Sequence, residues 1–582
     1  MRKSTTTFRL RQAGFAAWIL ACAPGANTGN ASTGGAAGYD VIIAGGRVID
    51  GTGNAWFLGD VALRGDRIAR ITPAGLLRDA ATKTRIDASG LVVAPGFIDI
   101  QSHSRDPFLM GDGRVISKIS QGITTEIMGE GWTNAPANDR TIGVLSAVDP
   151  SNAADSIARR FTGAHGFDTW LSAMQAHGTS PNFGSFIGAT TIRSYAKGSA
   201  AGAATATELD SMRAVTRQGM EDGAFGVASA LIYPPGSFAG TQELVEIAKA
   251  MAPYGGVYIS HMRSEADGYL EAIDELLRIG REGGVATEIY HLKAGGVRNW
   301  PKAAMAVAKI DSARAAGQDV QANMYPYVAG GTSLAACTPP WASADDKLLT
   351  NLRDPATRAR IVAEMNQDHT SWENLCRLAT PAGVMTLGYS TDSLRKYEGK
   401  RIAEIAASMK KDATNTVLDL VLATGGQVGM IVFMMSEPNV EMQLRQPWMK
   451  FGTDADGWDP DSAAKGLTHP RAYGTFPRIL GYYVRERHVM ALEDAVRKMS
   501  SAVATRLSIR DRGVLKEGMF ADVVVFDPST IADKGTFTQP HQVSTGMKHV
   551  FVNGTHVWND GKHTGAKPGR IVRGPGWKGW TP

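Results

Sequence analysis

The chain has 582 residues, and 43% of them are hydrophobic, which is ordinary for a globular protein with a sizeable buried core. Its formal net charge of +5 is small for this length and comes partly from a basic start and a basic end of the chain. This distribution argues against nucleic acid as the main partner.

The first 38 residues have the pattern of a secretory signal peptide followed by a flexible spacer. A basic start, Arg2 to Arg11, precedes the apolar run 13–23, which is too short to cross a bilayer. We therefore expect an exported protein, either periplasmic or secreted. The segment Ile19-Leu20-Ala21-Cys22 loosely resembles a lipoprotein cleavage site, so lipidation at Cys22 and simple cleavage both stay open. Such a lipid anchor is the one membrane contact that we expect.

From Tyr39 the pattern changes to short β-strands separated by Gly and Asp. Strands are predicted at 39–44, 47–49, 60–63, 67–71 and 91–94. The far end repeats this pattern at 521–526, 547–552 and 555–558, with a turn at Asn553-Gly554. Two β-rich ends predict one small β-sandwich assembled from 39–95 and 506–582.

The middle of the chain, 96–505, alternates short apolar strands with amphipathic helices. Strands at 223–228, 257–260 and 286–290 are followed by helices at 241–252, 267–282 and 301–316. This alternation predicts an α/β fold with a parallel sheet, and the length favours a closed (β/α)8 barrel. The polar segment 337–412 is the expected insertion over the barrel mouth.

The chain holds three cysteines, too few for a disulfide framework. Cys337 and Cys376 would be able to pair in an exported protein, but we expect ordinary free thiols. No phosphate-binding glycine loop is present, so no nucleotide cofactor is indicated.

Five side chains able to bind a metal stand just after predicted strands: His103, Glu130, His261, His291 and Asp454. In a barrel, residues at the C-terminal ends of the strands face the active site. Imidazole and carboxylate are ligands that Zn²⁺ accepts. One such histidine alone is more often a structural group, but five of these residues on five strand ends predict a metal centre.

Several segments together resemble the D-aminoacylase (N-acyl-D-amino-acid deacylase) branch of the amidohydrolase superfamily. The resemblance covers nearly everything from Tyr39 to about Gly574, and its motifs follow the family's order. The segments are Ala94-Pro95-Gly96-Phe97-Ile98-Asp99, Ser260-His261-Met262-Arg263, Tyr290-His291-Leu292-Lys293, Tyr325-Pro326-Tyr327-Val328-Ala329-Gly330, Gly474-Thr475-Phe476-Pro477-Arg478 and Glu517-Gly518-Met519-Phe520-Ala521-Asp522.

This resemblance implies the barrel, the small β-sandwich and zinc-dependent hydrolysis of an amide in a small carboxylate-bearing substrate. It implies that His261 and His291 bind the tightly held metal, with Glu130 as the shared ligand. It also implies that Lys293, Tyr325 and Arg471 hold the substrate carboxylate. Asp454 matches the catalytic aspartate, a general base for the attacking water and then a general acid for the leaving nitrogen.

One departure from the family pattern concerns the second metal. The family's His-x-His after the first barrel strand is here Gln101-Ser102-His103, and a neutral amide oxygen is a poorer zinc ligand than imidazole. We therefore expect one tightly bound zinc. His103 is expected to bind metal weakly or to hydrogen-bond the nucleophilic water.

Other interpretations stay open. Tyr233-Pro234-Pro235 either lines a pocket for the acyl group or forms only a rigid turn. The substrate is either an N-acyl-D-amino acid or another amide, such as a dipeptide, a cyclic amide or a xenobiotic. A barrel that binds without turnover is a further alternative, raised by Gln101. Oligomeric state, acyl-group preference and D-versus-L selectivity are not determined by the sequence.

Overall fold

The computed structural model describes residues 38–146, 157–368, 371–462 and 466–579. The predicted signal peptide and Cys22 lie outside these residues. Within the described ranges, every helix is too short or too polar to cross a bilayer.

The centre of the molecule is a barrel of parallel strands. In chain order these strands are β6 (Phe97–Asp99), β7 (Ile123–Met128), β8 (Asn182–Ser185) with β9 (Ile187–Gly188), β10 (Gly226–Ala230), β11 (Val257–His261), β12 (Ala286–Ile289), β13 (Val320–Met324) and β17 (Met449–Phe451). β8 and β9 are two halves of one strand, since β8 pairs with β7 and β9 pairs with β10. The described strands thus occupy eight positions, as a (β/α)8 barrel requires.

The barrel closes between its first and last strands. A parallel bridge joins Ser102 to Ala455. The backbone N–H of Asp454 donates to the carbonyl of Gln101 at 2.8 Å. Closure therefore places the loop that carries His103 directly beside the loop that carries Asp454.

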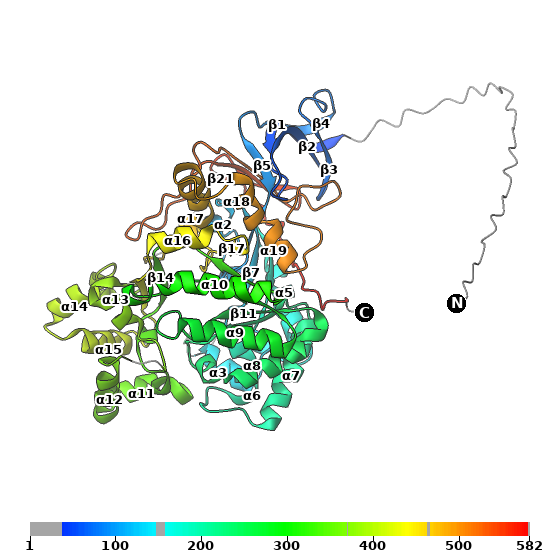
Figure 1. The fold of residues 1–582 in the computed structure, drawn as a ribbon. Helices are drawn as coiled ribbons and strands as arrows, with labels where there is room; N and C mark the ends of the chain where they lie inside the picture. The colour runs from blue at the N-terminus through cyan, green and yellow to red at the C-terminus, as the bar shows by residue number, and fades with distance from the viewer. Residues whose placement is uncertain (1–37, 147–156, 369–370, 463–465, 580–582) are drawn as a thin grey trace, which may run out of the picture. The chain divides into compact units, whose positions relative to one another are not determined.

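Helices cover the outside of the barrel (Figure 1). The main ones are α3 (Asp139–Ser146), α5 (Gly166–His177), α6 (Ala189–Lys197), α7 (Ala206–Glu221), α8 (Thr241–Met251), α9 (Tyr269–Gly283), α10 (Lys302–Ala315), α17 (Arg471–Arg478), α18 (Leu492–Met499) and α19 (Ser501–Arg506). Shorter helices, α1 (Arg105–Leu109) and α2 (Ile116–Ile119), follow β6. The helices expected at 241–252, 267–282 and 301–316 are confirmed as α8, α9 and α10.

Alternation along β11 shows how the sheet directs a side chain into the barrel. Val257 and Ile259 belong to the core inside the barrel, whereas Tyr258 belongs to the core under the helices. Because side chains alternate between the two faces of a strand, His261 shares the inward face of Val257 and Ile259. The last residue of β11 therefore points into the barrel mouth.

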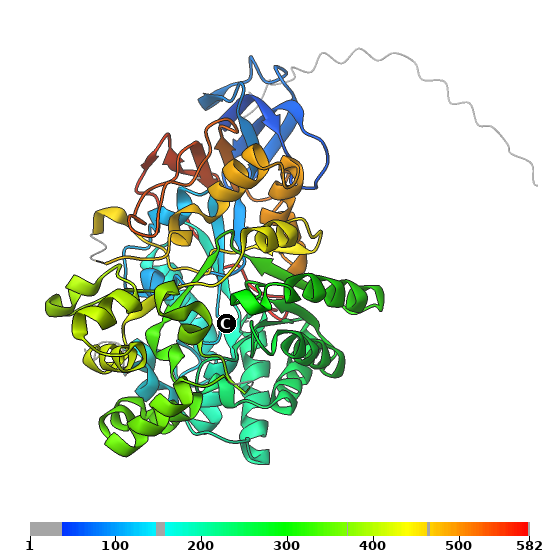
Figure 2. The same ribbon diagram turned by 60° about the vertical axis from the view of Figure 1, so that its left-hand side comes forward.

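Between β13 and β17 the chain leaves the barrel and forms a subdomain (Figure 2). Its sheet has the order β14 (Ala329–Ser333), β16 (Gly429–Phe433), β15 (Val384–Leu387), all antiparallel. Its helices are α11 (Leu348–Arg353), α12 (Pro355–Met365), α13 (Leu375–Gly383), α14 (Ile402–Met409) and α15 (Ala413–Ala423), and α16 (Glu437–Leu444) leads back to β17. The predicted insertion 337–412 lies inside this longer excursion, which has a hydrophobic core of its own.

Two cysteines of the insertion are joined. Cys337 and Cys376 form a disulfide across 39 residues of sequence. The expectation of free thiols was therefore wrong. Spacing alone did not show that the fold brings the end of the segment after β14 against α13.

The two ends of the chain build one β-domain, as predicted. Its sheet joins β1 (Tyr39–Val48), β2 (Phe57–Arg64), β3 (Arg67–Pro73), β4 (Thr82–Asp87), β5 (Val92–Pro95), β18 (Val523–Phe526), β19 (Met547–Val552), β20 (Thr555–Asn559) and β21 (Lys562–His563). Hydrogen bonds connect all nine strands in one sheet, and the junction is the antiparallel pair β5–β18. The predicted turn between β19 and β20 has positive φ at both Asn553 and Gly554, as a tight hairpin turn needs.

Candidate metal centre and active site

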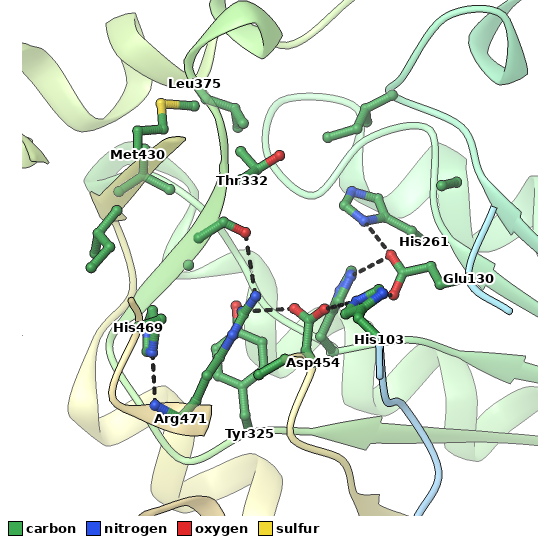
Figure 3. Close-up of a pocket in the computed structure, with 18 of the residues that line it drawn as sticks. His103, Glu130, His261, Tyr325, Thr332, Leu375, Met430, Asp454, His469 and Arg471 are labelled. Atoms are coloured by element: carbon green, nitrogen blue, oxygen red, sulfur yellow. Dashed lines mark hydrogen bonds and ion pairs between the residues drawn. The ribbon is translucent and has the colours of Figure 1, made fainter. Parts of the chain in front are cut away.

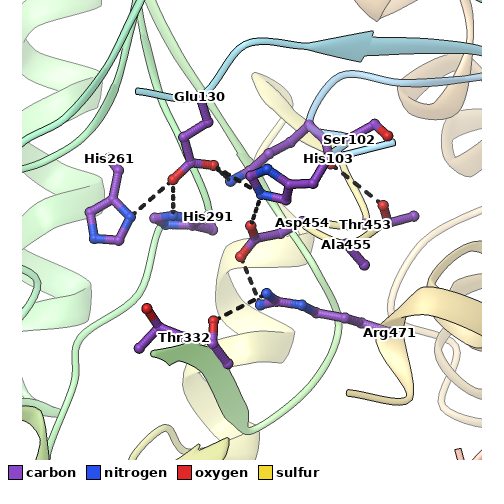
Figure 4. Close-up of polar contacts among 12 residues, drawn as sticks. Ser102, His103, Glu130, His261, His291, Thr332, Thr453, Asp454, Ala455 and Arg471 are labelled. Atoms are coloured by element: carbon purple, nitrogen blue, oxygen red, sulfur yellow. Dashed lines mark hydrogen bonds and ion pairs between the residues drawn. The ribbon is translucent and has the colours of Figure 1, made fainter. Parts of the chain in front are cut away.

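The five candidate ligands meet at the C-terminal mouth of the barrel. His261 ends β11 and His291 follows β12, while Glu130 follows β7. His103 follows β6, and Asp454 follows β17. Figure 4 shows Glu130 between the pair His261 and His291 on one side and His103 on the other.

Glu130, His261 and His291 form a compact group of possible ligands. Glu130 Oε1 lies 3.1 Å from His261 Nδ1 and 3.4 Å from His291 Nε2. One atom from each of these residues falls within 4.8 Å of the other two, with both histidines buried and Glu130 partly buried. Two imidazoles and one carboxylate fit a zinc ion and leave coordination positions open for water and substrate.

A second possible group shares the same carboxylate. His103 Nε2 lies 3.6 Å from Glu130 Oε2 and 2.8 Å from Asp454 Oδ1, so these three residues are also close enough together to hold a metal ion. However, Gln101 Nε2 donates to the same Glu130 Oε2 at 2.5 Å. The amide thus occupies the oxygen that would face a second cation.

Asp454 is held between His103 and Arg471. Its Oδ1 contacts His103, and its Oδ2 lies 2.7 Å from a guanidinium nitrogen of Arg471. Burial opposes ionisation, but the charge of Arg471 outweighs it, so the pKa of Asp454 lies below its usual range. The side chain is therefore a carboxylate at neutral pH, as a general base must be.

Arg471 begins α17 and is itself fixed by several neighbours. It lies over the ring of Tyr325 at 4.6 Å and donates to the carbonyl of Gly331 at 3.3 Å (Figure 3). Its backbone N–H donates to His469 Nδ1, while His469 Nε2 donates to the carbonyl of Ala329. Burial, followed by the charge of Arg471, lowers the pKa of His469 far below its usual value, so this imidazole is neutral.

Lys293 lies deeper than its predicted role in holding the substrate suggests. Its ammonium donates to Glu265 Oε1 at 2.5 Å and lies 2.8 Å from His291 Nδ1. Tyr325 is close as well, with its ring centroid 5.8 Å from the ammonium. The three predicted carboxylate-binding residues, Lys293, Tyr325 and Arg471, are therefore together, but Lys293 is already paired.

Glu265 is a residue that sequence reasoning missed. It is buried, and one of its oxygens lies 2.8 Å from His291 Nδ1. Burial opposes its charge, but Lys293 and the two histidines outweigh it and hold the pKa of Glu265 far below its usual range. Its position four residues after His261 is the only sequence signal that would have pointed to it.

Two site residues have strained backbones. His291 has φ of 34° and Asp454 has φ of 50°, a region that non-glycine residues rarely adopt. Such conformations each cost about 1–3 kcal/mol and gather at functional sites. With these backbone conformations, His291 faces Glu130 and Asp454 faces His103.

The ligands line a cavity of about 340 Å³. The barrel supplies its polar side, and the insertion supplies an apolar side (Figure 3). The apolar residues from the insertion are Leu375, Leu387, Met430, Ile431, Val432 and Met434. Tyr233 lines the cavity too, packs on His261 at 5.2 Å between ring centroids, and hydrogen-bonds Thr332.

Comparison with known proteins identifies relatives along almost the whole chain. Residues 84–558 match the model of the Amidohydrolase family. A D-aminoacylase of Alcaligenes xylosoxydans xylosoxydans is 35% identical over 536 residues, which are 92% of this chain and 97% of that protein.

Two solved structures extend this comparison. A D-aminoacylase with a binuclear metal centre has a TM-score of 0.76 and 33% identity, covering 92% of this chain and 100% of that chain. An N-acyl-D-glutamate deacylase of Bordetella bronchiseptica, complexed with zinc and a phosphonate inhibitor, has a TM-score of 0.74 and 31% identity over the same shares.

Proposed function

We propose that this chain, which belongs to the amidohydrolase family and to its D-aminoacylase branch, hydrolyses the amide bond of N-acyl-D-amino acids. One observation carries this proposal. One cavity is lined by three residues able to bind zinc, by an ionised aspartate and by a buried arginine. The ligand group and the aspartate suit amide hydrolysis, and the arginine suits a substrate with a free carboxylate.

We infer one tightly held zinc on Glu130, His261 and His291. A zinc ion bound there supplies Lewis acidity, which lowers the pKa of water and polarises an amide carbonyl. The hydrogen bond from Gln101 to the second oxygen of Glu130 supports one ion rather than two.

Asp454 carries the proton transfers in this proposal. Its carboxylate takes a proton from the attacking water and then donates it to the leaving nitrogen. His103 donates to Asp454 Oδ1 and keeps the carboxylate facing the ligand group. Arg471 on the other oxygen keeps Asp454 ionised before the reaction begins.

Arg471 and Tyr325 are the proposed anchors of the substrate carboxylate. The guanidinium is planar and suits a two-pronged contact with a carboxylate. Lys293 adds positive charge beside the Tyr325 ring, 5.8 Å from its centroid, although Glu265 neutralises much of it.

The apolar side of the cavity favours a substrate with an apolar side chain. Every residue that the insertion contributes to the described lining is uncharged. Arg471 and Lys293 are already paired with Asp454 and Glu265. A second carboxylate on the substrate side chain, as in an acyl-glutamate, would therefore meet only uncharged residues on the side that the insertion supplies.

The test is a substrate panel with purified, zinc-loaded protein. N-acetyl-D-leucine should be hydrolysed, N-acetyl-L-leucine far more slowly, and N-acetyl-D-glutamate with a raised KM. Asp454→Asn protein is the matched control for contaminating activity. Equal inactivity toward the D- and L-leucine derivatives would refute the proposal.

We further propose export to an oxidising compartment. The Cys337–Cys376 disulfide supports this, because such bonds persist mainly outside the cytosol. Cell fractionation should find the protein in the periplasm or medium, and thiol titration of the denatured protein should find neither cysteine free. Protein confined to the cytoplasm, with both thiols free, would contradict the proposal.

A further inference from the structure

Each of the two ligand histidines faces Glu130 with one ring nitrogen and Glu265 with the other. On their inner side, His261 Nδ1 and His291 Nε2 face Glu130 Oε1 (Figure 4). On their outer side, His291 Nδ1 lies 2.8 Å from Glu265 Oε1, and His261 Nε2 lies 3.8 Å from Glu265 Oε2. Each oxygen of one carboxylate thus faces a different histidine.

The nitrogen that faces Glu130 can bind a cation only if the imidazole proton lies on the nitrogen that faces Glu265. An imidazole that binds a metal through one nitrogen carries its proton on the other. The buried His261 Nε2 has no hydrogen-bond partner among the described residues, so the negative charge of Glu265 is what favours a proton there. For His291, a proton on Nδ1 is accepted by Glu265 Oε1 at 2.8 Å.

Lys293 and Glu265 compete for His291 Nδ1 and favour opposite positions of its proton. Its ammonium also lies 2.8 Å from His291 Nδ1 and, because it only donates, would force the proton onto Nε2, the inner nitrogen. Lys293 has two other acceptors in the same place, Glu265 Oε1 at 2.5 Å and the backbone carbonyl of His291 at 3.1 Å, and Glu265 is the charged one. With Glu265 present, Lys293 is satisfied without His291 Nδ1.

Glu265 is held firmly enough for this task. Its side chain is buried, and its backbone N–H donates to Glu373 Oε1 at 2.6 Å. Glu373 also accepts from Ser264 at 2.6 Å, which ties the loop after β11 to the insertion. These bonds hold the backbone of Glu265, and the contacts of its Oε1 with Lys293 and His291 hold the carboxylate.

We propose that Glu265 is the positioning residue of the metal centre. One carboxylate keeps both histidines with their inner nitrogens unprotonated and directed at the cation. The inference rests on the proposed function in one respect, because it takes Glu130, His261 and His291 as the zinc ligands. Partners of this kind typically contribute 10–100-fold to metal affinity.

The experiment measures zinc affinity rather than turnover. Full-length wild type and Glu265→Gln protein are stripped of metal and titrated with zinc against a chelator of known affinity. We expect the Kd of the variant to rise by roughly 10–100-fold. The matched control is Glu271→Gln, the same change at an exposed glutamate of α9, which should leave the Kd unchanged.

Two further measurements keep the test decisive. The thermal midpoint of the zinc-free proteins separates a positioning role from misfolding, since a positioning residue changes Kd more than the zinc-free midpoint. If Glu265→Gln does not fold, Glu265→Asp keeps the charge but shortens the side chain, and it should also weaken zinc binding. A wild-type Kd in a folded Glu265 variant would overturn the inference, as would the absence of tight zinc binding in wild type. Tight zinc without hydrolysis of any N-acyl amino acid would refute only the proposed function.

Discussion

Lys118 is a fully buried cation, and its removal gives the sharpest test of how the active-site loops are held. Its ammonium donates to Asp99 Oδ2 at 2.9 Å, to Thr453 Oγ1 at 2.5 Å and to the carbonyl of Ala455 at 2.7 Å. Thr453 and Ala455 flank Asp454. The substitution Lys118→Met should therefore lower both stability and kcat.

The size of the stability loss follows from burial. Breaking a buried ion pair by removing one partner costs about 3–5 kcal/mol, because the other charge is left uncompensated. Lys118 and Asp99 side chains are both 0% exposed. Asp99 keeps three donors, the backbone N–H groups of Gln101 and Thr453 and the Thr453 hydroxyl. Glu126, also 0% exposed and 3.4 Å from the ammonium, loses the same cation, so we expect a loss of about 3–5 kcal/mol.

Urea unfolding followed by tryptophan fluorescence measures this loss. The matched control is Lys83→Met, since Lys83 makes an ion pair of similar length with Asp40, 2.8 Å, but is 82% exposed. Exposed pairs contribute little, so its unfolding midpoint should match that of wild type. If Lys118→Met also unfolds at the wild-type midpoint, the argument from burial is wrong.

Four further predictions concern the site and the insertion. Asp454→Asn should lower kcat about 10²–10⁴-fold while zinc content by elemental analysis stays unchanged, and normal turnover would remove Asp454 as the base. Chelator-stripped protein should be inactive and recover with added zinc, whereas full activity without metal would contradict the proposed mechanism. Arg471→Lys keeps the charge but loses the two-pronged contact, so kcat/KM for N-acetyl-D-leucine should fall roughly 10–100-fold, the effect of losing a charged hydrogen bond. The double variant Cys337→Ser/Cys376→Ser opens a loop of 39 residues, which destabilises the insertion by roughly 4 kcal/mol in the chain-entropy account. Limited proteolysis should then cut the insertion first, and an unchanged cleavage pattern would argue against this role.

The barrel was predictable because its signals are local. Strand β11 and helices α8, α9 and α10 follow from apolar periodicity within short windows, and the observed bounds differ by only a few residues. The boundaries of the excursion were not predictable, because β14 and β16 pair across about 95 residues of sequence. The disulfide was missed for the same reason.

The metal ligands were predictable from their positions after strands, whereas the residues that hold the ligands and their loops in place were not. His261, His291 and Glu130 each follow a strand, and a barrel brings strand ends together whatever the loops do. Glu265 has only the weak signal of lying four residues after His261, and Lys118 lies in the short helix α2. Both act through side-chain contacts with residues that are not their neighbours in sequence, which residue types alone do not indicate. The pairing of Lys293 with Glu265 likewise depends on side-chain depth, which no pattern of residue types encodes.

The junction between β5 and β18 has a consequence for how the molecule is made. During synthesis, the N-terminal strands emerge first, yet one edge of β5 has no partner until the last strands leave the ribosome. In that interval the Val92–Pro95 edge offers unpaired backbone groups to any neighbouring chain. A nascent or C-terminally truncated molecule should therefore be the aggregation-prone form, whereas the finished chain covers that edge with its own tail end.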